Sequence, residues 1–138
     1  MKNLFLIYLI SLFFSHYAIS SDSIVVVANT QNTPISLTRQ EIRNLFMGSV
    51  LSYDLKAVAL PQENQTRVLF NTKIIGLTES RIQSYWAQMR FSGRKTQPIE
   101  ISSETLVIEY LQAHPGTVSY ISADMKIPNN LTILFQID

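Results

Sequence analysis

The sequence contains no cysteine among its 138 residues. Disulfide scaffolds, thiolate nucleophiles and Cys-ligated zinc or iron–sulfur sites are therefore excluded. Glycine and proline are also scarce, with 4 and 5 residues, and only 15% of the residues are charged. This composition excludes collagen-like repeats and argues against a largely disordered chain. Because 46% of the residues are hydrophobic, we expect one domain with a buried core.

Neither sign of charge dominates the sequence. Its 11 basic and 10 acidic side chains give a formal net charge of +1. A protein that binds nucleic acid strongly usually carries a clear excess of Lys and Arg, because it must neutralise a phosphate backbone. We therefore expect no nucleic-acid partner.

The first twenty residues have the three-part pattern of a secretory signal peptide. Lys2 supplies the positive start, residues 4–14 form an apolar run interrupted only by Ser11, and residues 18–20 (Ala-Ile-Ser) suit a signal peptidase. The apolar run is shorter than the roughly 20 residues that cross a bilayer, so cleavage is favoured over an uncleaved N-terminal helix. The sequence thus predicts a signal peptide at residues 1–20 and a periplasmic chain that begins near Ser21, with no lipid anchor and no membrane insertion.

The predicted mature chain has few groups suited to catalysis. Removing residues 1–20 leaves 118 residues, takes away Lys2 and His16, and leaves His114 as the only imidazole. No serine or acid is placed to complete a nucleophile–base relay with it, and one imidazole without thiols is a poor zinc site. We therefore assign no catalytic residue, no metal and no cofactor, and predict that the protein is not an enzyme.

Short apolar runs alternate with segments of helical periodicity along residues 21–138. Strands are expected at residues 23–29, 56–60, 99–101, 117–122 and 131–137. Helices are expected at residues 37–48, from residue 66 to 76, from the cap Thr78 through Met89, and from Ser102 or Ser103 through Leu111. This alternation predicts a single α/β domain, residues 21–138, with a mainly parallel sheet flanked by helices.

The segment Asn64-Gln65-Thr66-Arg67 is the best candidate for a ligand site. It follows a predicted strand and opens a predicted helix. In open parallel sheets, ligands bind beyond the carboxyl ends of the strands, where helix N-termini offer unpaired N–H groups. The chemistry favours an oxyanion. The structural alternative, which has the greater weight from these residues alone, is that Asn64 or Thr66 caps the helix and Arg67 lies in solvent.

A second group of cations lies at residues 90–95, Arg-Phe-Ser-Gly-Arg-Lys. Arg94 is the member that we expect to reach an anion or an acidic partner. The alternative with the greater weight is a solvated helix end, where cations offset the partial negative charge of the helix dipole. Tyr53, Tyr85 and Trp86 suit a pocket, but aromatic residues at helical spacing are mostly core packing.

Several phrases of the sequence resemble one known family. They are residues 25–29 (VVVAN), 37–48 (LTRQEIRNLFMG), 85–86 (YW), 91–94 (FSGR) and 115–121 (PGTVSYI). In this order they resemble the phosphate-type substrate-binding proteins of ABC importers, and among those the small periplasmic members. The resemblance covers nearly all of residues 21–138. It implies a type 2 periplasmic-binding fold, of which this chain is long enough for one lobe.

The resemblance also places a phosphate site at residues 63–66. In the relatives, a Gly/Ser/Thr-rich turn at a helix start donates hydrogen bonds to phosphate. Here Thr66 matches that turn, Asn64 replaces a serine, both glycines are absent, and Leu60 stands where the relatives carry an arginine. Glu63 lies beside the site and would repel an anion. These departures predict weak binding.

Two functions from different classes follow. The first is an exported solute-binding-like protein that holds phosphate or a related oxyanion weakly, with an ABC permease as partner and a homodimer as a way to enclose the ligand. The second is a periplasmic accessory protein that has lost ligand binding and docks on an envelope protein.

Overall fold

The computed structural model describes residues 22–93 and 95–138. The predicted signal peptide at residues 1–20, and Arg94, lie outside the described residues. The chain order is β1 (Ile24–Ala28), α1 (Arg39–Phe46), β2 (Lys56–Ala59), α2 (Gln65–Phe70), a π-helical turn η1 (Asn71–Ile75), α3 (Glu79–Ser92), β3 (Ile99–Glu100), α4 (Glu104–Ala113), β4 (Thr117–Ser122) and β5 (Thr132–Ile137). Every strand and helix that the sequence predicted is present, within a few residues at each end.

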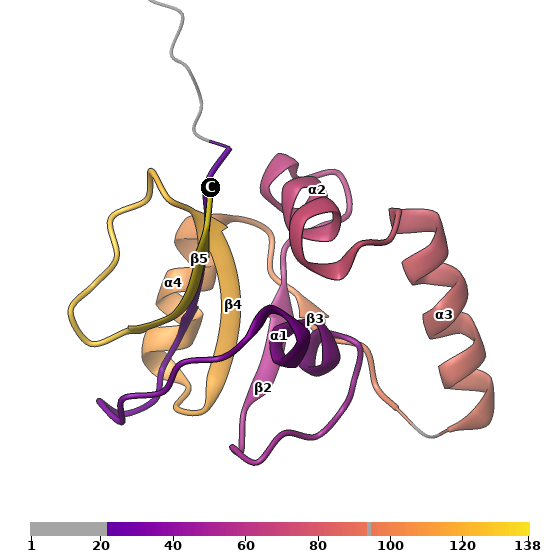
Figure 1. Ribbon diagram of the computed structural model, residues 1–138, viewed down its shortest axis with the longest axis horizontal. Helices are drawn as coiled ribbons and strands as arrows, with labels where there is room; N and C mark the ends of the chain where they lie inside the picture. Colours follow the sequence, from indigo (N-terminus) through magenta and orange to yellow (C-terminus); the bar gives the residue numbers. More distant parts are fainter. Residues whose placement is uncertain (1–21, 94) are drawn as a thin grey trace, which may run out of the picture.

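The five strands form one sheet in the order β3-β2-β4-β1-β5 (Figure 1). β2 is parallel to β3 and β4, whereas β1 is antiparallel to both β4 and β5. Four strands therefore run in one direction and β1 runs against them. The predicted α/β fold with a mainly parallel sheet is confirmed, and β1 is the one strand in the opposite direction.

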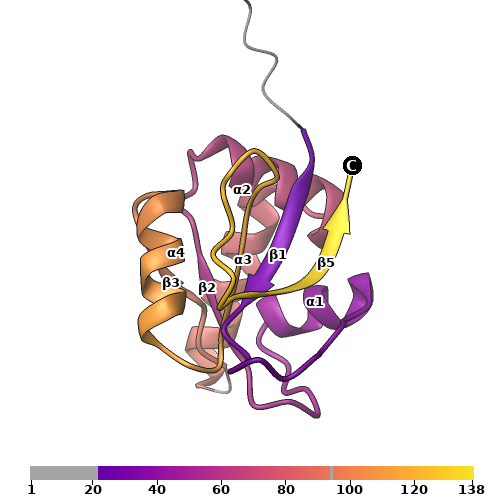
Figure 2. The same ribbon diagram turned by 90° about the vertical axis from the view of Figure 1, so that its left-hand side faces the viewer.

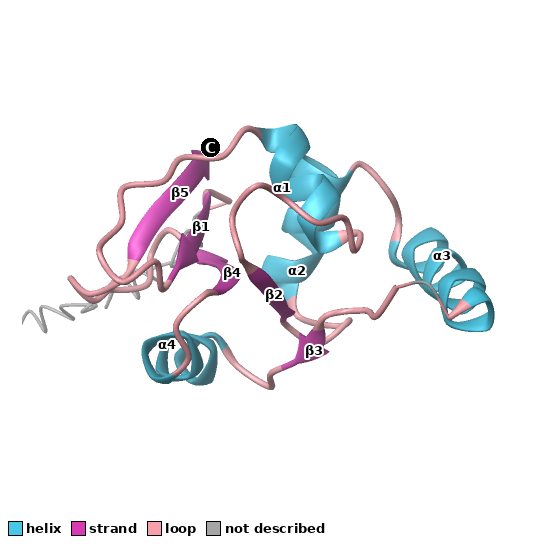
Figure 3. Ribbon diagram, turned by 90° about the horizontal axis from the view of Figure 1, so that it is seen from below, coloured by secondary structure: helices cyan, strands magenta, loops and turns pink. Residues whose placement is uncertain are grey.

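Helices cover both faces of this sheet. α4 lies against one face, while α1 and α2 lie against the other (Figures 2 and 3). α3 stands apart, beyond the β3 edge of the sheet (Figure 3). The architecture is thus three layers, with α3 added at one end.

The core between α1, α2 and the sheet is built on three aromatic rings. Phe70 stacks on Tyr120 with ring centroids 3.9 Å apart, and Phe46 meets the edge of Phe70 at 4.7 Å. All three side chains are buried. The Tyr120 hydroxyl accepts a hydrogen bond from the Leu60 backbone N–H, 3.1 Å away. The end of β2 is therefore fixed to β4 by a side chain as well as by the sheet.

α1 begins and ends where the sequence signals predicted. Thr38 and Glu41 form a reciprocal capping box at its start. After the C-cap Met47, Gly48 adopts a φ of +89°, which a residue with a Cβ rarely adopts. A Cβ at this position would also lie 3.0 Å from the Trp86 ring. Glycine therefore allows α3 to approach the end of α1.

No helix among residues 22–93 and 95–138 combines the length and the apolar character needed to span a membrane.

Candidate functional site at the start of helix α2

α2 opens directly beyond the carboxyl end of β2, as the sequence predicted. Asn64 is its N-cap, and the Asn64 side-chain oxygen accepts hydrogen bonds from the backbone N–H groups of Thr66, at 2.9 Å, and Arg67, at 3.4 Å. The predicted capping role of Asn64 is therefore confirmed. These two N–H groups converge on one oxygen, which is the arrangement in which a helix start receives an oxyanion.

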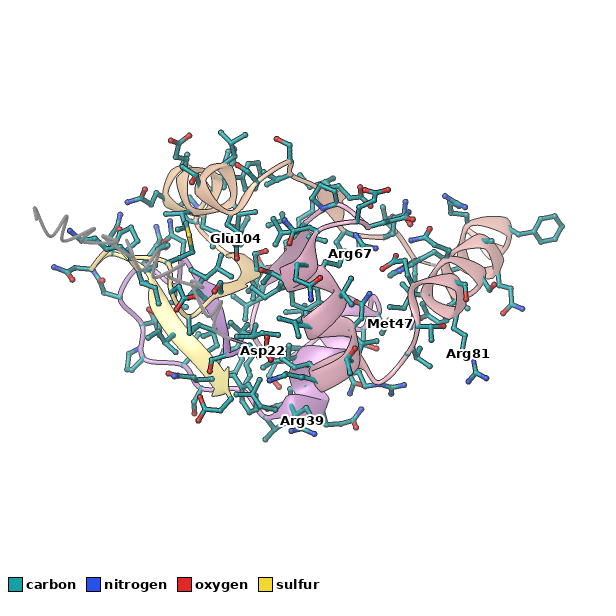
Figure 4. All side chains as sticks on the ribbon, turned by 90° about the horizontal axis from the view of Figure 1, so that it is seen from above. Asp22, Arg39, Met47, Arg67, Arg81 and Glu104 are labelled. Atoms are coloured by element: carbon teal, nitrogen blue, oxygen red, sulfur yellow. The ribbon has the colours of Figure 1, made fainter. Side chains whose placement is uncertain are left out.

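The four predicted site residues differ in exposure. Gln65 is exposed and Asn64 is half-buried, whereas Thr66 and Arg67 are buried, with 8% and 7% of their surfaces exposed. The alternative that Arg67 lies in solvent is therefore wrong. Its side chain points inward, and Figure 4 shows it within the body of the molecule.

The Arg67 guanidinium is held by two carboxylates and one carbonyl. Its Nε donates to Glu79 Oε2 at 2.9 Å, and a second nitrogen pairs with the other Glu79 oxygen. The remaining nitrogen donates to the Leu60 carbonyl at 2.7 Å and to Glu100 at 3.1 Å. The bidentate pair with Glu79 fixes the plane of the guanidinium. Arg67 therefore ties α2 to α3 and β3.

Electrostatics stabilise this cluster in its charged form. Burial disfavours the charge on Arg67, but the hydrogen bond and charge of Glu79 outweigh burial and raise the pKa of Arg67. Burial likewise disfavours ionised Glu79, yet hydrogen bonds from Arg67, Gln83 and Asn71 keep the Glu79 pKa below its ordinary value. Burial raises the pKa of Tyr120, which keeps its hydroxyl neutral. The positive charge of Arg67 is thus matched inside the protein.

Sequence reasoning missed Glu79, Glu100 and Glu104 as neighbours of this region. Glu79 and Glu100 hold Arg67, and Glu104 in the first turn of α4 accepts a hydrogen bond from the Ser122 backbone N–H at the end of β4. Glu63 precedes the Asn64 cap and is exposed. The carboxyl edge of the parallel strands is therefore rich in acidic side chains. The only signal for Glu104 in the sequence was its place one residue after the predicted cap Ser103.

The second predicted cation group lies elsewhere. Arg94 is outside the described residues, so its role stays a prediction. The described members, Arg90 and Lys95, lie at the far end of α3, whereas Glu79 at the near end contacts Arg67. With 14 residues, α3 is about 21 Å long at 1.5 Å per residue. The structure therefore does not bring Arg90 or Lys95 to the start of α2.

Tyr85 and Trp86 of α3 pack as predicted. Trp86 is buried, and its ring meets Tyr85 edge-on at 5.1 Å. The Tyr85 hydroxyl donates to the Met47 carbonyl at 2.7 Å and accepts from Lys95 at 3.3 Å. Tyr53, in contrast, is 42% exposed on the loop before β2.

A cavity of about 40 Å³ lies between α3 and the sheet. Polar groups of Arg67, Asn71 and Glu100 and the ring of Trp86 line it. This volume is enough to hold water. Because Arg67 lines it, the cavity is a part of the Arg67 cluster.

His114 has a structural role in the described chain. Its Nδ1 lies 2.8 Å from the Tyr110 carbonyl, and its ring stacks on Tyr110 with centroids 3.9 Å apart. Over residues 22–93 and 95–138, no three side chains among His, Cys, Asp and Glu gather closely enough to hold a metal ion.

The comparisons with known proteins bear on the fold. No protein-family model matches the chain, and no curated protein sequence matches it. A solved structure does match: an ABC-type phosphate transport receptor from Vibrio cholerae, with a TM-score of 0.60 and 15% sequence identity over 81% of this chain. The chain has the fold of one periplasmic-binding-protein lobe. It spans 45% of the receptor, so less than half of that protein has a counterpart here.

Proposed function

We propose that this chain is a solute-binding-like module that holds a small phosphate-like oxyanion at the start of α2. The observation that carries the proposal is the Asn64 cap, because its oxygen occupies the point on which the Thr66 and Arg67 N–H groups converge. An oxygen of phosphate would take the same place. The fold supports the proposal, since the similar receptor is described as a phosphate transport receptor.

The proposed binding is weak for two physical reasons. The Asn64 side chain competes with the ligand for the same N–H groups. The Arg67 charge is already matched by Glu79 and Glu100, while Glu63 adds a further negative charge near the helix start. An oxyanion therefore gains the helix dipole and the backbone donors but little net positive charge.

Replacing the cap tests the site directly. In Asn64→Gly, the two N–H groups lose their internal acceptor, while the helix loses only a few tenths of a kcal/mol of stability. We expect titration calorimetry to show tighter binding of inorganic phosphate by this variant than by the natural protein. Thr66→Ala and Arg67→Ala should each weaken binding in either background.

A matched control is available on another helix. Ser103 caps α4 with the same kind of side-chain bond, to the Leu106 N–H. Ser103→Gly should leave phosphate binding unchanged. If neither the natural protein nor Asn64→Gly binds phosphate or sulfate at millimolar concentration, the start of α2 is not an oxyanion site.

The proposal extends to location and partners. The predicted signal at residues 1–20 places the mature chain in the periplasm, without a lipid, where an ABC permease would receive a bound solute. Mass spectrometry of the protein from a periplasmic fraction should find an N-terminus near Ser21. A chain recovered intact in the membrane fraction would contradict this part of the proposal.

A second function is favoured by a different observation. The guanidinium of Arg67 and the backbone N–H groups of Thr66 and Arg67 all have acceptors within the protein. A module of this kind needs no anion, and we propose as the alternative an accessory protein that docks on an envelope partner. Under it, a panel of oxyanions leaves the melting temperature unchanged. A rise in melting temperature with phosphate would exclude it.

A further inference from the structure

A polar hollow of about 320 Å³ lies at the end of the sheet opposite the start of α2. Its lining comes mainly from three places: the turn after β1 (residues 29–31 and Thr33), the loop that leads into β2 (residues 52–55), and Gly116 just before β4. Because α2 follows the other end of β2, the polar hollow is separate from the candidate oxyanion site. Its volume is in the range of small-molecule sites.

The turn after β1 is held in an uncommon backbone conformation. Gln31 and Asn32 have φ angles of 53° and 64°. Asparagine tolerates this region, but a glutamine there is uncommon. The Asn29 side-chain oxygen accepts a hydrogen bond from the Gln31 N–H at 3.2 Å, and the Thr30 hydroxyl donates to the Thr33 carbonyl at 2.7 Å. Buried Asn29 and Thr30 thus hold a strained turn, and strain of this kind is concentrated at functional sites.

Gly116 fixes the loop on the other side of the polar hollow. It has a φ of +80°, and a Cβ at this position would lie 3.2 Å from the backbone oxygen of Asp54. The Gly116 N–H donates to the Asn29 carbonyl at 2.8 Å, and the Gly116 carbonyl accepts from the Lys56 N–H at 2.8 Å. One glycine therefore joins the two walls, and backbone contacts determine where Asp54 lies relative to the turn.

Asp54 is the one charged side chain among the described residues that line the polar hollow. It is exposed, and neither ion pair found within residues 22–93 and 95–138 includes it. The loop also borders a separate groove, which Lys56 lines together with Asp54. Lys56 does not line the polar hollow and does not pair with Asp54. The polar hollow therefore carries a negative charge and no positive one.

The carbonyl end of α4 adds to this negative character. The Asn29 side-chain nitrogen donates to the Leu111 carbonyl at 2.8 Å and to the Gln112 carbonyl at 3.4 Å. Both carbonyls belong to the last turn of α4, which has 10 residues and no basic side chain in that turn. A helix C-terminus has a partial negative charge that favours a nearby cation. Asn29 therefore contacts the negative end of α4 and lines the polar hollow as well.

An aromatic ring stands next to the carboxylate. Tyr53 precedes Asp54, lines the polar hollow and is 42% exposed. A carboxylate attracts a cation by charge, and an accessible aromatic ring attracts it through the electrons of its face. We propose that the polar hollow binds a small organic cation, an amine or quaternary ammonium group, with Asp54 and Tyr53 as its principal contacts. This site does not depend on oxyanion binding at the start of α2.

An NMR titration of the natural protein with choline tests the proposal. With ionic strength held constant by sodium chloride, we expect saturable shifts of the Gln31, Tyr53 and Gly116 amide signals and none at Thr66. The matched probe is the uncharged analogue of choline, in which carbon replaces nitrogen. It should bind about tenfold more weakly, because it loses both the ion pair and the cation–π contact.

Substitutions separate the two contacts. Asp54→Asn and Tyr53→Leu should each weaken choline binding by about three- to fivefold, whereas Tyr53→Phe keeps the ring and should bind as the natural protein does. Both positions are exposed, so the melting temperature without ligand should not change. Glu63→Gln is the matched control, because it removes the same charge from an exposed position at the other end of the sheet and should leave choline binding unchanged.

Three results would overturn the proposal. The first is a set of shifts that grows with choline concentration without saturating. The second is equal binding of choline and its uncharged analogue, which would show that charge is not recognised. The third is an equal loss in Asp54→Asn and Glu63→Gln, which would show general attraction to a negative surface instead of a site.

Discussion

The centre of the sheet and helix α3 are held in place by different physical means. All five residues of β1 are buried between β4 and β5, none with more than 3% of its surface exposed. α3 is longer, yet Ile82 and Trp86 are its only buried residues. Its remaining attachments are specific polar contacts, chiefly Glu79 with Arg67 and Tyr85 with the Met47 carbonyl. Extensive apolar burial therefore secures the sheet, while a few directed contacts position α3.

This difference predicts two levels of stability in one chain. Apolar burial contributes in proportion to area and is lost only when the whole core opens. A helix attached by a few side chains can open locally at a smaller free-energy cost. Substitutions in the two regions should accordingly differ in size and in the amide protons they expose.

The largest effect is expected in the aromatic core. Phe70→Ala removes a ring that contacts both Phe46 and Tyr120, and we expect the free energy of unfolding to fall by about 3–5 kcal/mol. Urea denaturation measures the loss. Val68→Ala on the same helix is the control, because Val68 is 44% exposed and should change stability by less than about 0.5 kcal/mol. Equal losses would remove the distinction between core and surface on α2.

The next largest effect is expected from a substitution in α3, and it distinguishes local unfolding of this helix from unfolding of the whole domain. Trp86→Ala removes the largest buried side chain of α3, and we expect the free energy of unfolding to fall by about 2–3 kcal/mol. This is less than the usual cost of removing a buried aromatic ring, because α3 can detach while the sheet stays folded. Hydrogen exchange should accelerate throughout α3 and stay unchanged in β1 and β4. Uniform acceleration across the sheet would show that α3 belongs to the cooperative core.

A smaller effect is expected from the charge cluster. Arg67→Met leaves Glu79 and Glu100 without their cation and the Leu60 carbonyl without its donor, and should cost about 1–3 kcal/mol. The carboxylates are partly exposed, which limits the penalty. Arg81→Met, an exposed arginine of α3, serves as the control and should have almost no effect on chemical denaturation.

The smallest expected effect is on how stability depends on pH in acid. The pKa of Glu79 is lowered in the folded protein, so its stabilising contribution is present above the ordinary Glu pKa of about 4.3 and is lost as pH falls through the lowered value. Glu79→Gln should flatten the fall of melting temperature below this pH. Glu41 also has a lowered pKa, through bonds from Thr38, so Glu41→Gln gives the comparison for a group that does not attach α3.

Local sequence signals predicted the element starts well. Thr38, Thr78 and Ser103 are N-caps as expected, and Asn64 rather than Thr66 caps α2. Capping depends on residues two or three positions apart, so one short window contains the whole interaction. The same holds for the buried runs that became β1 and β4.

Contacts between residues far apart in the sequence could not be predicted from local sequence patterns. Arg67 contacts Glu79 and Glu100 from 12 and 33 positions away, so no short sequence pattern joins the three residues. Likewise, a fully buried apolar run is compatible with either strand direction. The antiparallel direction of β1 is determined by its pairing with β4 and β5, which lie about a hundred positions later in the sequence. The ligand role of Asn64 to Arg67 remains a prediction for the same reason, because it depends on what meets the helix start.

The position of β1 constrains the order in which the protein can fold. Ile24 is in register with Ser122 on one side and Ile137 on the other, so the strand near the beginning of the chain is completed only by residues near its end. Contacts that separate such distant positions slow folding, because a long loop must close before they form. A growing polypeptide on the ribosome lacks both neighbours of β1 until residues 117–137 have been made, so this sheet cannot be completed before then.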